Sequence, residues 1–287
     1  MIKKSTIQLL RFHFSFFLMP IFWFALSQVI DICIFDAILV FFILHILVYP
    51  ASNGYNSYMD KDETSIGGIK NPMQPTMQLY YATMIMDIVA ILFSLLINFH
   101  FAVGVLIYIL VSKAYSYRGI RLKKYSIIGF LTVVFFQGAF TFALVYYGVS
   151  TNKSFQIPFL PILASALLIG GFYPLTQIYQ HQADKNDGVT TISYLLGYKG
   201  TFIFTAIIYT FSFAVLAFWF FSTLQQNSFF IMQLFFIPVL ISFFIWAKKV
   251  WANTDEANFK NTMRMNLIAS ICTNLAFITL LILQIFE

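Results

Sequence analysis

The sequence contains nine runs of mostly apolar residues that are each long enough to cross a lipid bilayer as a helix. A spanning helix needs about 20 such residues, because the hydrocarbon core offers no water to backbone polar groups. Charged residues make up only 10% of the chain, against about 25% in an ordinary soluble domain. This pattern excludes a water-soluble fold and predicts an all-α integral membrane protein with one domain, residues 1–287. The predicted spans are residues 12–30, 33–51, 78–97, 100–116, 125–147, 158–180, 201–223, 228–247 and 265–286.

The basic residues predict the orientation of these spans. With nine spans and a cytoplasmic N-terminus, 16 of the 17 Lys and Arg residues fall in cytoplasmic segments, and only Lys153 falls outside. Cytoplasmic loops carry the Lys and Arg excess in membrane proteins, so we expect the N-terminus inside and the C-terminus outside. The net charge of +6 then reflects orientation and not a nucleic-acid partner. The fourth run is the weakest, because Lys113 ends it early; a re-entrant fourth segment would reverse every later one.

Two acidic clusters follow the second and sixth predicted spans, and both are expected at the cytoplasmic surface. They contain Asp60, Asp62 and Glu63 in NGYNSYMDKDETS, and Asp184 and Asp187 in YQHQADKNDG. Asn56 and Asp60 are four residues apart, which places them on one face of a helix. The same spacing separates Gln180 from Asp184. The repeated arrangement predicts that two sets of oxygen ligands meet across the bundle.

Such a meeting would form a site for a hard cation. Mg²⁺ prefers oxygen ligands, and it takes one or two carboxylates from a protein and completes its shell with water and substrate phosphate. Basic residues predicted on the same side could hold the phosphates: Lys70, Arg121, Lys123 and Lys185. The apolar bundle would accommodate a hydrocarbon tail. Together these features predict an enzyme that binds a lipid diphosphate with its head at the cytoplasmic surface.

Each of these features also has a simpler explanation. An acidic loop can be merely solvated, and basic cytoplasmic loops can act only as orientation signals. Asp87 lies inside the third predicted span; an intramembrane acid indicates either a functional site or an interhelical hydrogen bond, and both alternatives stay open. Cys33 and Cys272 lie in or beside apolar runs and are expected to serve packing.

The chain resembles the UbiA superfamily of intramembrane prenyltransferases, which have nine transmembrane helices and two Asp-rich motifs after helices two and six. The first family motif usually reads Asn-x-x-x-Asp-x-x-x-Asp; Asn56 and Asp60 match it, whereas Thr64 replaces the last Asp and Glu63 lies beside it. In the second motif Gln180 replaces the first Asp and Asp187 is an additional acid. The residues in register with the second motif are Asp184, Gly188, Thr191, Leu196 and Gly197.

The resemblance implies Mg²⁺-dependent transfer of a prenyl group from a prenyl diphosphate to a small hydroxylated aromatic acceptor, such as a quinone precursor. It implies that Asp60 and Asp184 are catalytic, and that Tyr117 and Arg121 fit the family's Tyr-x-x-x-Lys/Arg pattern at the diphosphate. The implied metal ligands are Asn56, Asp60 and Asp184, with Glu63, Gln180 and Asp187 as substitutes for the missing acids. The protein would lie in a bacterial inner membrane or an organellar membrane, with its active site on the cytoplasmic side.

The alternatives are a secondary transporter or another polytopic membrane protein without transferase activity. Asp87 and the internal repeat favour a transporter, since intramembrane acids and repeats are common there. The position of most acids at the membrane surface, away from the midplane, disfavours it. Another lipid-diphosphate or phospholipid head-group transferase ranks lower, because the acidic motif of phosphatidyl-alcohol transferases is missing from the sequence.

Overall fold

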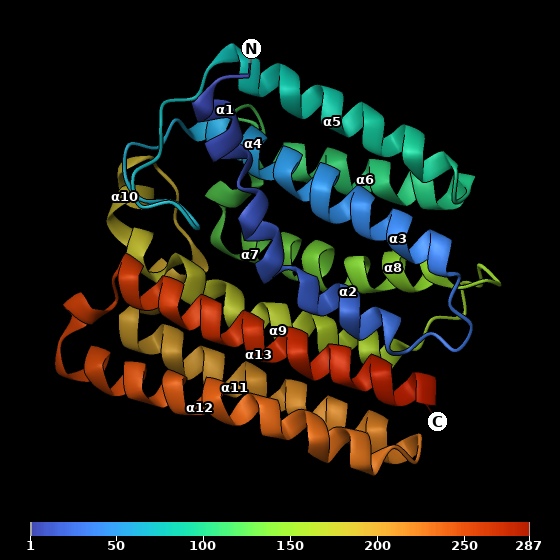
Figure 1. Cartoon of the computed structure of the whole chain (residues 1–287). Helices are drawn as coiled ribbons and strands as arrows, with labels where there is room; N and C mark the ends of the chain where they lie inside the picture. The colour runs from blue at the N-terminus through green and yellow to red at the C-terminus, as the bar shows by residue number, and fades with distance from the viewer. Residues whose placement is uncertain (1, 287) are drawn as a thin grey trace.

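The computed structural model describes residues 2–286 as a bundle of helices without a named strand in that range (Figure 1). Its helices are α1 (Lys4–Leu10), α2 (Met19–Leu26), α3 (Ile34–Phe41), α4 (Tyr49–Asp60), α5 (Met77–Leu95), α6 (Phe99–Ser116), α7 (Ser126–Val133), α8 (Thr141–Val149), α9 (Phe159–Gln177), α10 (His181–Asn186), α11 (Ile192–Ser222), α12 (Gln226–Ala252) and α13 (Phe259–Phe286). Short π-helical or 3₁₀ turns join several of them. The all-helical prediction is confirmed.

The helices give eight segments long and apolar enough to cross a membrane within the described residues. A ninth span results if the bent pair Lys4–Phe17 and Met19–Leu26, which meet at 42°, is counted as one. The structure therefore agrees with the predicted number of spans. The second span continues to Asp60, beyond the predicted end at residue 51. The helix continues to Asp60 because the polar turns of α4 pack against neighbouring helices and stay helical.

The fourth predicted span is one continuous helix, α6, and not a re-entrant segment. Lys113, which falls near the end of this predicted span and was counted with the cytoplasmic basic residues, lies in the last turn of α6. Its ammonium group lies 2.7 Å from a carboxylate oxygen of Asp87 on α5, and 4.0 Å from the centre of the Tyr55 ring. Of the two alternatives for Asp87, the structure shows an interhelical partner, here an ion pair.

The first span is broken near its polar end. Helix α1 ends at Leu10, and the next residue, Arg11, has a left-handed backbone with φ of 49°. A 3₁₀ turn, Phe12–Phe17, follows, and α2 begins with Pro20 in its first turn. A non-glycine residue rarely adopts a left-handed backbone, and such residues concentrate at functional sites. The break separates a short polar-end helix from the apolar part of the span.

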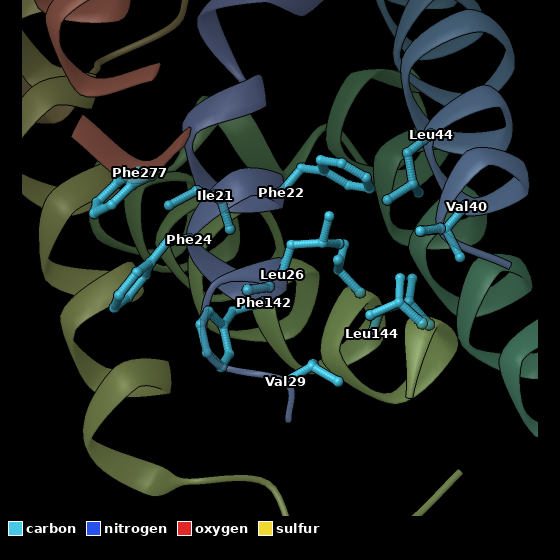
Figure 2. Packing of buried hydrophobic residues seen from close by; sticks show 14 of the residues in the cluster. Ile21, Phe22, Phe24, Leu26, Val29, Val40, Leu44, Phe142, Leu144 and Phe277 are labelled. Carbon is cyan, nitrogen blue, oxygen red and sulfur yellow. The ribbon is translucent and has the colours of Figure 1, made fainter. Parts of the chain in front are cut away.

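The apolar core joins helices that are distant in sequence. Figure 2 shows Phe24 of α2 between Phe277 of α13 and Phe142 of α8. The Phe24 ring centre lies 4.6 Å from that of Phe277 and 5.3 Å from that of Phe142. Each of the three side chains is fully buried. By contrast, large apolar residues are exposed along the outer faces of α5, α11 and α12, as expected for helices that face lipid.

The π-helical turn Val134–Phe140 between α7 and α8 brings two backbones into close contact. A Cβ atom added to Gly138 in this turn would lie 2.7 Å from the Ala166 Cα and 2.7 Å from the Ser165 carbonyl oxygen on α9. Backbone atoms cannot move aside cheaply. Gly138 is therefore required for the approach of this segment to α9.

We expect Gly138→Ala to lower the free energy of unfolding by about 1–3 kcal/mol, the usual cost of overpacking. The measurement is thermal unfolding of the purified protein in detergent. Gly170→Ala is the matched control, because its Cβ would meet nothing closer than Val134 Cγ2 at 3.4 Å. Equal stability of the two variants would contradict the close approach.

The N-terminus, α10 and the ends of α4 and α9 lie at one end of the bundle, and the C-terminus lies at the other (Figure 1). This arrangement agrees with an odd number of spans. The cytoplasmic position of the N-terminal end stays a prediction.

Single-cysteine labelling tests that orientation in a background without Cys33 and Cys272. A cysteine replacing exposed Lys70 should react with an impermeant maleimide only after the membrane is permeabilised, since its loop is predicted to be cytoplasmic. A cysteine replacing exposed Asn152, at the other end, should react in intact cells or right-side-out vesicles. The opposite labelling pattern would reverse the predicted topology.

Candidate active site

A cavity of about 190 Å³ lies at the N-terminal end of the bundle. Its wall combines residues from the first, second, fourth to sixth and last spans. The lining residues include Arg11, Phe14, Asn53, Asn56, Asp60, Asp62, Tyr115, Lys123, Gln137, Tyr173, Gln177, Tyr179, Gln180, Asp184 and Asn266. Both acidic clusters therefore contribute to a single cavity, although they are more than 100 residues apart in the sequence.

Helix α4 supplies the first set of oxygen ligands. It follows the π-helical turn Phe42–Val48, and such turns recur at functional sites. Asp60 forms an ion pair with Lys123, and one of its oxygens lies 3.6 Å from Arg121 Nη2. The Asn56 Oδ1 accepts hydrogen bonds from Ser116 Oγ at 2.8 Å and Lys123 Nζ at 3.1 Å. Lys123 therefore links the two oxygen-bearing side chains that face the cavity.

The second set comes from the sixth span, where α9 passes through a 3₁₀ turn, Ile178–Gln180, into α10. Gln180 and Asp184 both line the cavity. The Gln180 amide nitrogen donates to the Ser65 carbonyl oxygen at 3.3 Å, which connects the turn before α10 to the loop after α4. The two predicted pairs thus meet at one site, as their repeated spacing suggested.

Asp62 also lines the cavity, although it is not among the predicted ligands. Helix α4 ends at Asp60, and Lys61 has a left-handed backbone with φ of 55°, so helical spacing no longer applies. Glu63, a ligand implied by the family resemblance, is exposed and outside the cavity lining. Burial, with the nearby Asp60 carboxylate, raises the pKa of Asp62 to about 6. A bound divalent cation would favour its ionised form.

Several predicted diphosphate residues lie outside the cavity lining. Lys70, Tyr117 and Lys185 are exposed, and only Lys123 of the predicted cations is part of the lining. Arg121 is buried behind Asp60 and pairs with Asp187, which Arg118 also contacts at 3.2 Å. Asp187 therefore joins the loop before α7 to the end of α10. It does not line the cavity.

Four uncharged residues of the cavity wall are not among the predicted site residues. Asn53, Gln177, Tyr179 and Asn266 line the cavity from α4, α9, the turn after it and α13. Asn53 lies three residues before Asn56, one helical turn away, so its spacing was a usable signal. Asn266 is an amide near the start of an apolar span, and nothing else in the sequence marks it.

The donor set fits a substrate-dependent metal. Within residues 2–286, no three His, Cys, Asp or Glu side chains are grouped closely enough to hold a metal without other ligands. Asp60, Asp62 and Asp184 nevertheless share the cavity with the Asn56 amide, and a buried Asp60 oxygen, Oδ1, has no hydrogen-bond partner among those residues. Mg²⁺ bound through few carboxylates and through phosphate oxygens needs only such a set.

A family model described as the UbiA prenyltransferase family matches residues 14–268. A sequence search of curated proteins finds no match. Among solved structures, a UbiA homologue from Archaeoglobus fulgidus bound to GPP and Mg²⁺ is similar, with a TM-score of 0.66, 16% identity and coverage of 96% of this chain and 100% of that chain. The apo structure of a UbiA homologue from Aeropyrum pernix K1 is similar with a TM-score of 0.66 and 16% identity. The match covers 94% of this chain and 98% of that chain.

A structure described in connection with digeranylgeranylglyceryl phosphate synthase is also similar, with a TM-score of 0.63, 19% identity and coverage of 97% of this chain and 98% of that one. At these sequence identities, the similarity to the solved structures shows the fold alone. The match of the family model extends over both acidic clusters and most of the spans. The chain is a multi-pass membrane protein and belongs to the UbiA prenyltransferase family.

Proposed function

We propose that this member of the family uses Mg²⁺ to transfer a prenyl group from a prenyl diphosphate to a small hydroxylated aromatic acceptor. One observation carries the proposal: Asp60 and Asp184, from two distant spans, line the same cavity as Lys123. The solved relatives bound to GPP and Mg²⁺, and to DMAPP and Mg²⁺, support the choice of donor and metal. The position of the acids at one end of the bundle disfavours a transporter, whose site would lie near the midplane.

In this proposal, Asp60, Asp62, Asp184 and the Asn56 amide hold Mg²⁺ together with the diphosphate oxygens. The metal neutralises negative charge on the departing diphosphate. Lys123 now pairs with Asp60; its flexible ammonium can turn to a phosphate oxygen when Mg²⁺ takes over the carboxylate. Glu63, Lys70, Tyr117 and Lys185 have no assigned contact with substrate in this arrangement.

The transfer exchanges one bond for another. The bond between C1 of the prenyl group and oxygen breaks, and diphosphate leaves with the electron pair. A bond then forms between C1 and an electron-rich acceptor carbon, which releases its proton. Tyr115 and Tyr173 line the cavity, and their hydroxyls hydrogen-bond to each other. Their rings could stabilise positive charge on the allyl group.

The test is a transfer assay with purified full-length protein, Mg²⁺ and labelled prenyl diphosphates of different lengths. Acceptors are hydroxylated aromatic acids, hydroxylated naphthoates and a glycerol phosphate lipid, and the readout is product mass. Product from an aromatic acceptor that disappears with EDTA supports the proposal. Product only from the glycerol phosphate lipid would keep the donor and correct the acceptor. Cleavage of the diphosphate without any transfer product would contradict the proposal.

A further inference from the structure

Helix α10 carries Asp184, yet it contains only six residues, His181–Asn186. A helix this short is not stable in water by itself, because forming its first turn is unfavourable. Contacts with neighbouring elements must therefore fix its position. Gln180 and Asp187 make such contacts on either side of α10, but among the six side chains of α10 itself only that of His181 is buried. His181 is thus the one buried side chain that can anchor this helix.

The His181 side chain contacts the first two turns of α11. Its Nε2 lies 2.8 Å from the Ser193 hydroxyl oxygen. Its ring stacks on that of Tyr198 with 4.7 Å between the ring centres, and the Tyr194 ring packs edge-on at 5.6 Å. The imidazole therefore makes one directional contact, the hydrogen bond to Ser193, and two ring contacts that depend less on direction.

A break in α11 holds the Ser193 hydroxyl in place. Gly197 has φ of 67° and ψ of 175° inside this helix, a conformation that is essentially restricted to glycine. Ser193 and Thr201 are eight residues apart, and a regular helix would separate them by about 12 Å along its axis. Because of the break, their hydroxyl oxygens lie only 3.1 Å apart.

The hydrogen bonds around Ser193 have a defined direction. The Thr201 hydroxyl donates to backbone carbonyl oxygens, that of Gly197 at 2.8 Å and that of Ser193 at 3.2 Å. Its oxygen therefore accepts from the Ser193 hydroxyl, and the Ser193 oxygen accepts from the Nε2–H of His181. All three side chains are buried. A buried network in which each of these groups is bonded is rigid, so it gives α10 a firm attachment to α11.

Helix geometry connects this attachment to the metal site. His181 and Asp184 are three residues apart, nearly one turn, so a shift or rotation of α10 that moves the imidazole also moves the carboxylate. Among the described residues, Asp184 is the only charged side chain that the sixth span contributes to the cavity lining, because Gln180 is neutral. A ligand must be held within about 0.5 Å of its productive position. The placement of this single carboxylate therefore depends on what anchors α10.

We propose that His181 is a positioning residue, which sets the placement of the Asp184 carboxylate for the divalent cation through its hydrogen bond to Ser193. His181 is not part of the cavity lining, so it acts on the metal site through α10. Loss of a side chain that orients a metal ligand typically costs about 10- to 100-fold in metal affinity. The inference rests on the proposed function, because it assumes that Asp184 binds the metal.

Two substitutions separate the hydrogen bond from the ring contacts. His181→Phe keeps a ring against Tyr198 but cannot bond to Ser193, so it should weaken divalent-cation binding by about 10- to 100-fold. His181→Gln places an amide nitrogen near the position of Nε2 and should bind the cation within about threefold of wild type. The control is Gln182→Ala, at an exposed position of α10 outside the cavity lining, which should change the affinity by less than about twofold.

The probe is Mn²⁺, because it prefers the same oxygen ligands as Mg²⁺ and electron paramagnetic resonance measures its free concentration. Full-length wild-type protein and each variant are titrated with Mn²⁺ in the presence of geranyl thiolodiphosphate. Transfer rates over a range of Mg²⁺ concentrations accompany the titration. We expect His181→Phe to raise the Mg²⁺ concentration for half-maximal rate more than it lowers the maximal rate, since excess metal compensates for a misplaced ligand and not for a loss of folding.

Hydrogen exchange of the α10 amides, measured without metal, follows the anchoring itself. Exchange should be faster in His181→Phe than in wild type, and it should return toward the wild-type rate in His181→Gln. Wild-type protein that binds no Mn²⁺ would contradict the proposed function, whereas faster exchange in His181→Phe would still support the anchoring of α10. Unchanged exchange would overturn the anchoring.

Two results of the titration would overturn the positioning role. One is a Mn²⁺ affinity of His181→Phe equal to that of wild type. The other is equal weakening in His181→Phe and His181→Gln, which would assign the effect to packing of the ring and not to the hydrogen bond. If His181→Phe folds poorly, Ser193→Ala replaces it, because this variant removes the hydroxyl and keeps the imidazole. An unchanged Mn²⁺ affinity in Ser193→Ala then overturns the role.

Discussion

Asp60→Asn should reduce Mg²⁺-dependent prenyl transfer by about 100- to 1,000-fold, the usual cost of removing one electrostatic group at a reacting centre. The amide keeps the shape of the side chain but removes the charge that would bind Mg²⁺. Asp184→Asn should have a similar effect, because the two carboxylates line one cavity. Initial rates with saturating acceptor and a range of Mg²⁺ concentrations provide the measurement.

Neighbouring acids provide the controls. Asp62→Asn should also lower the rate, whereas Glu63→Gln should leave it within about twofold, since Glu63 is exposed and outside the cavity lining. The two substitutions make the same chemical change one residue apart. A large effect of Glu63→Gln with none from Asp62→Asn would reject this assignment of ligands. Full activity of Asp60→Asn would reject a metal site at the end of α4.

Lys113→Met should lower the free energy of unfolding by about 3–5 kcal/mol, the cost of leaving a buried charge without its partner. Lys113 and Asp87 lie 2.7 Å apart with 17% and 10% of their side chains exposed. The variant would leave the Asp87 carboxylate facing a methionine in the apolar part of the bundle. Unfolding by SDS titration in mixed micelles, followed by circular dichroism, measures the change.

The double variant Lys113→Met with Asp87→Asn should recover much of that stability, because neither side chain then carries a charge. Lys248→Met, at an exposed position on α12, controls for the loss of a lysine and should change stability by less than about 0.5 kcal/mol. A double variant as unstable as Lys113→Met would show that the lysine stabilises α6 through contacts other than the Asp87 pair.

Helix number, and the meeting of two acidic segments, could be predicted from the sequence, because both depend on regular spacing. Apolar length sets the spans, and a spacing of four aligns Asn56 with Asp60 along α4. Helical spacing stops predicting which side chains face the cavity at the first residue whose backbone is not helical. Lys61 has a left-handed backbone, so Asp62 lines the cavity and Glu63 does not.

Long-range pairing is the other property that regular spacing does not report. Lysine is costly in a membrane, so Lys113 weakens the fourth predicted span, and its contact with Asp87 explains its place inside α6. Arg11 is a second case: a basic residue before a span usually reports orientation, whereas the structure buries Arg11 at the break after α1. There it donates to the carbonyl oxygens of Asn53 and Gly67. None of these is visible in a local pattern.

Lys153, the one basic residue at the end of the bundle opposite the cavity by the predicted topology, lies 2.6 Å from Asp36 and donates to the Gly148 carbonyl oxygen at 2.5 Å. The two charged residues are 117 positions apart. Because the chain is synthesised from its amino end, Asp36 has no counter-ion until Lys153, in the segment after the fifth span, has been translocated. The ion pair therefore forms late in biogenesis. It would connect the early spans to the later ones only after the first half of the protein has been inserted.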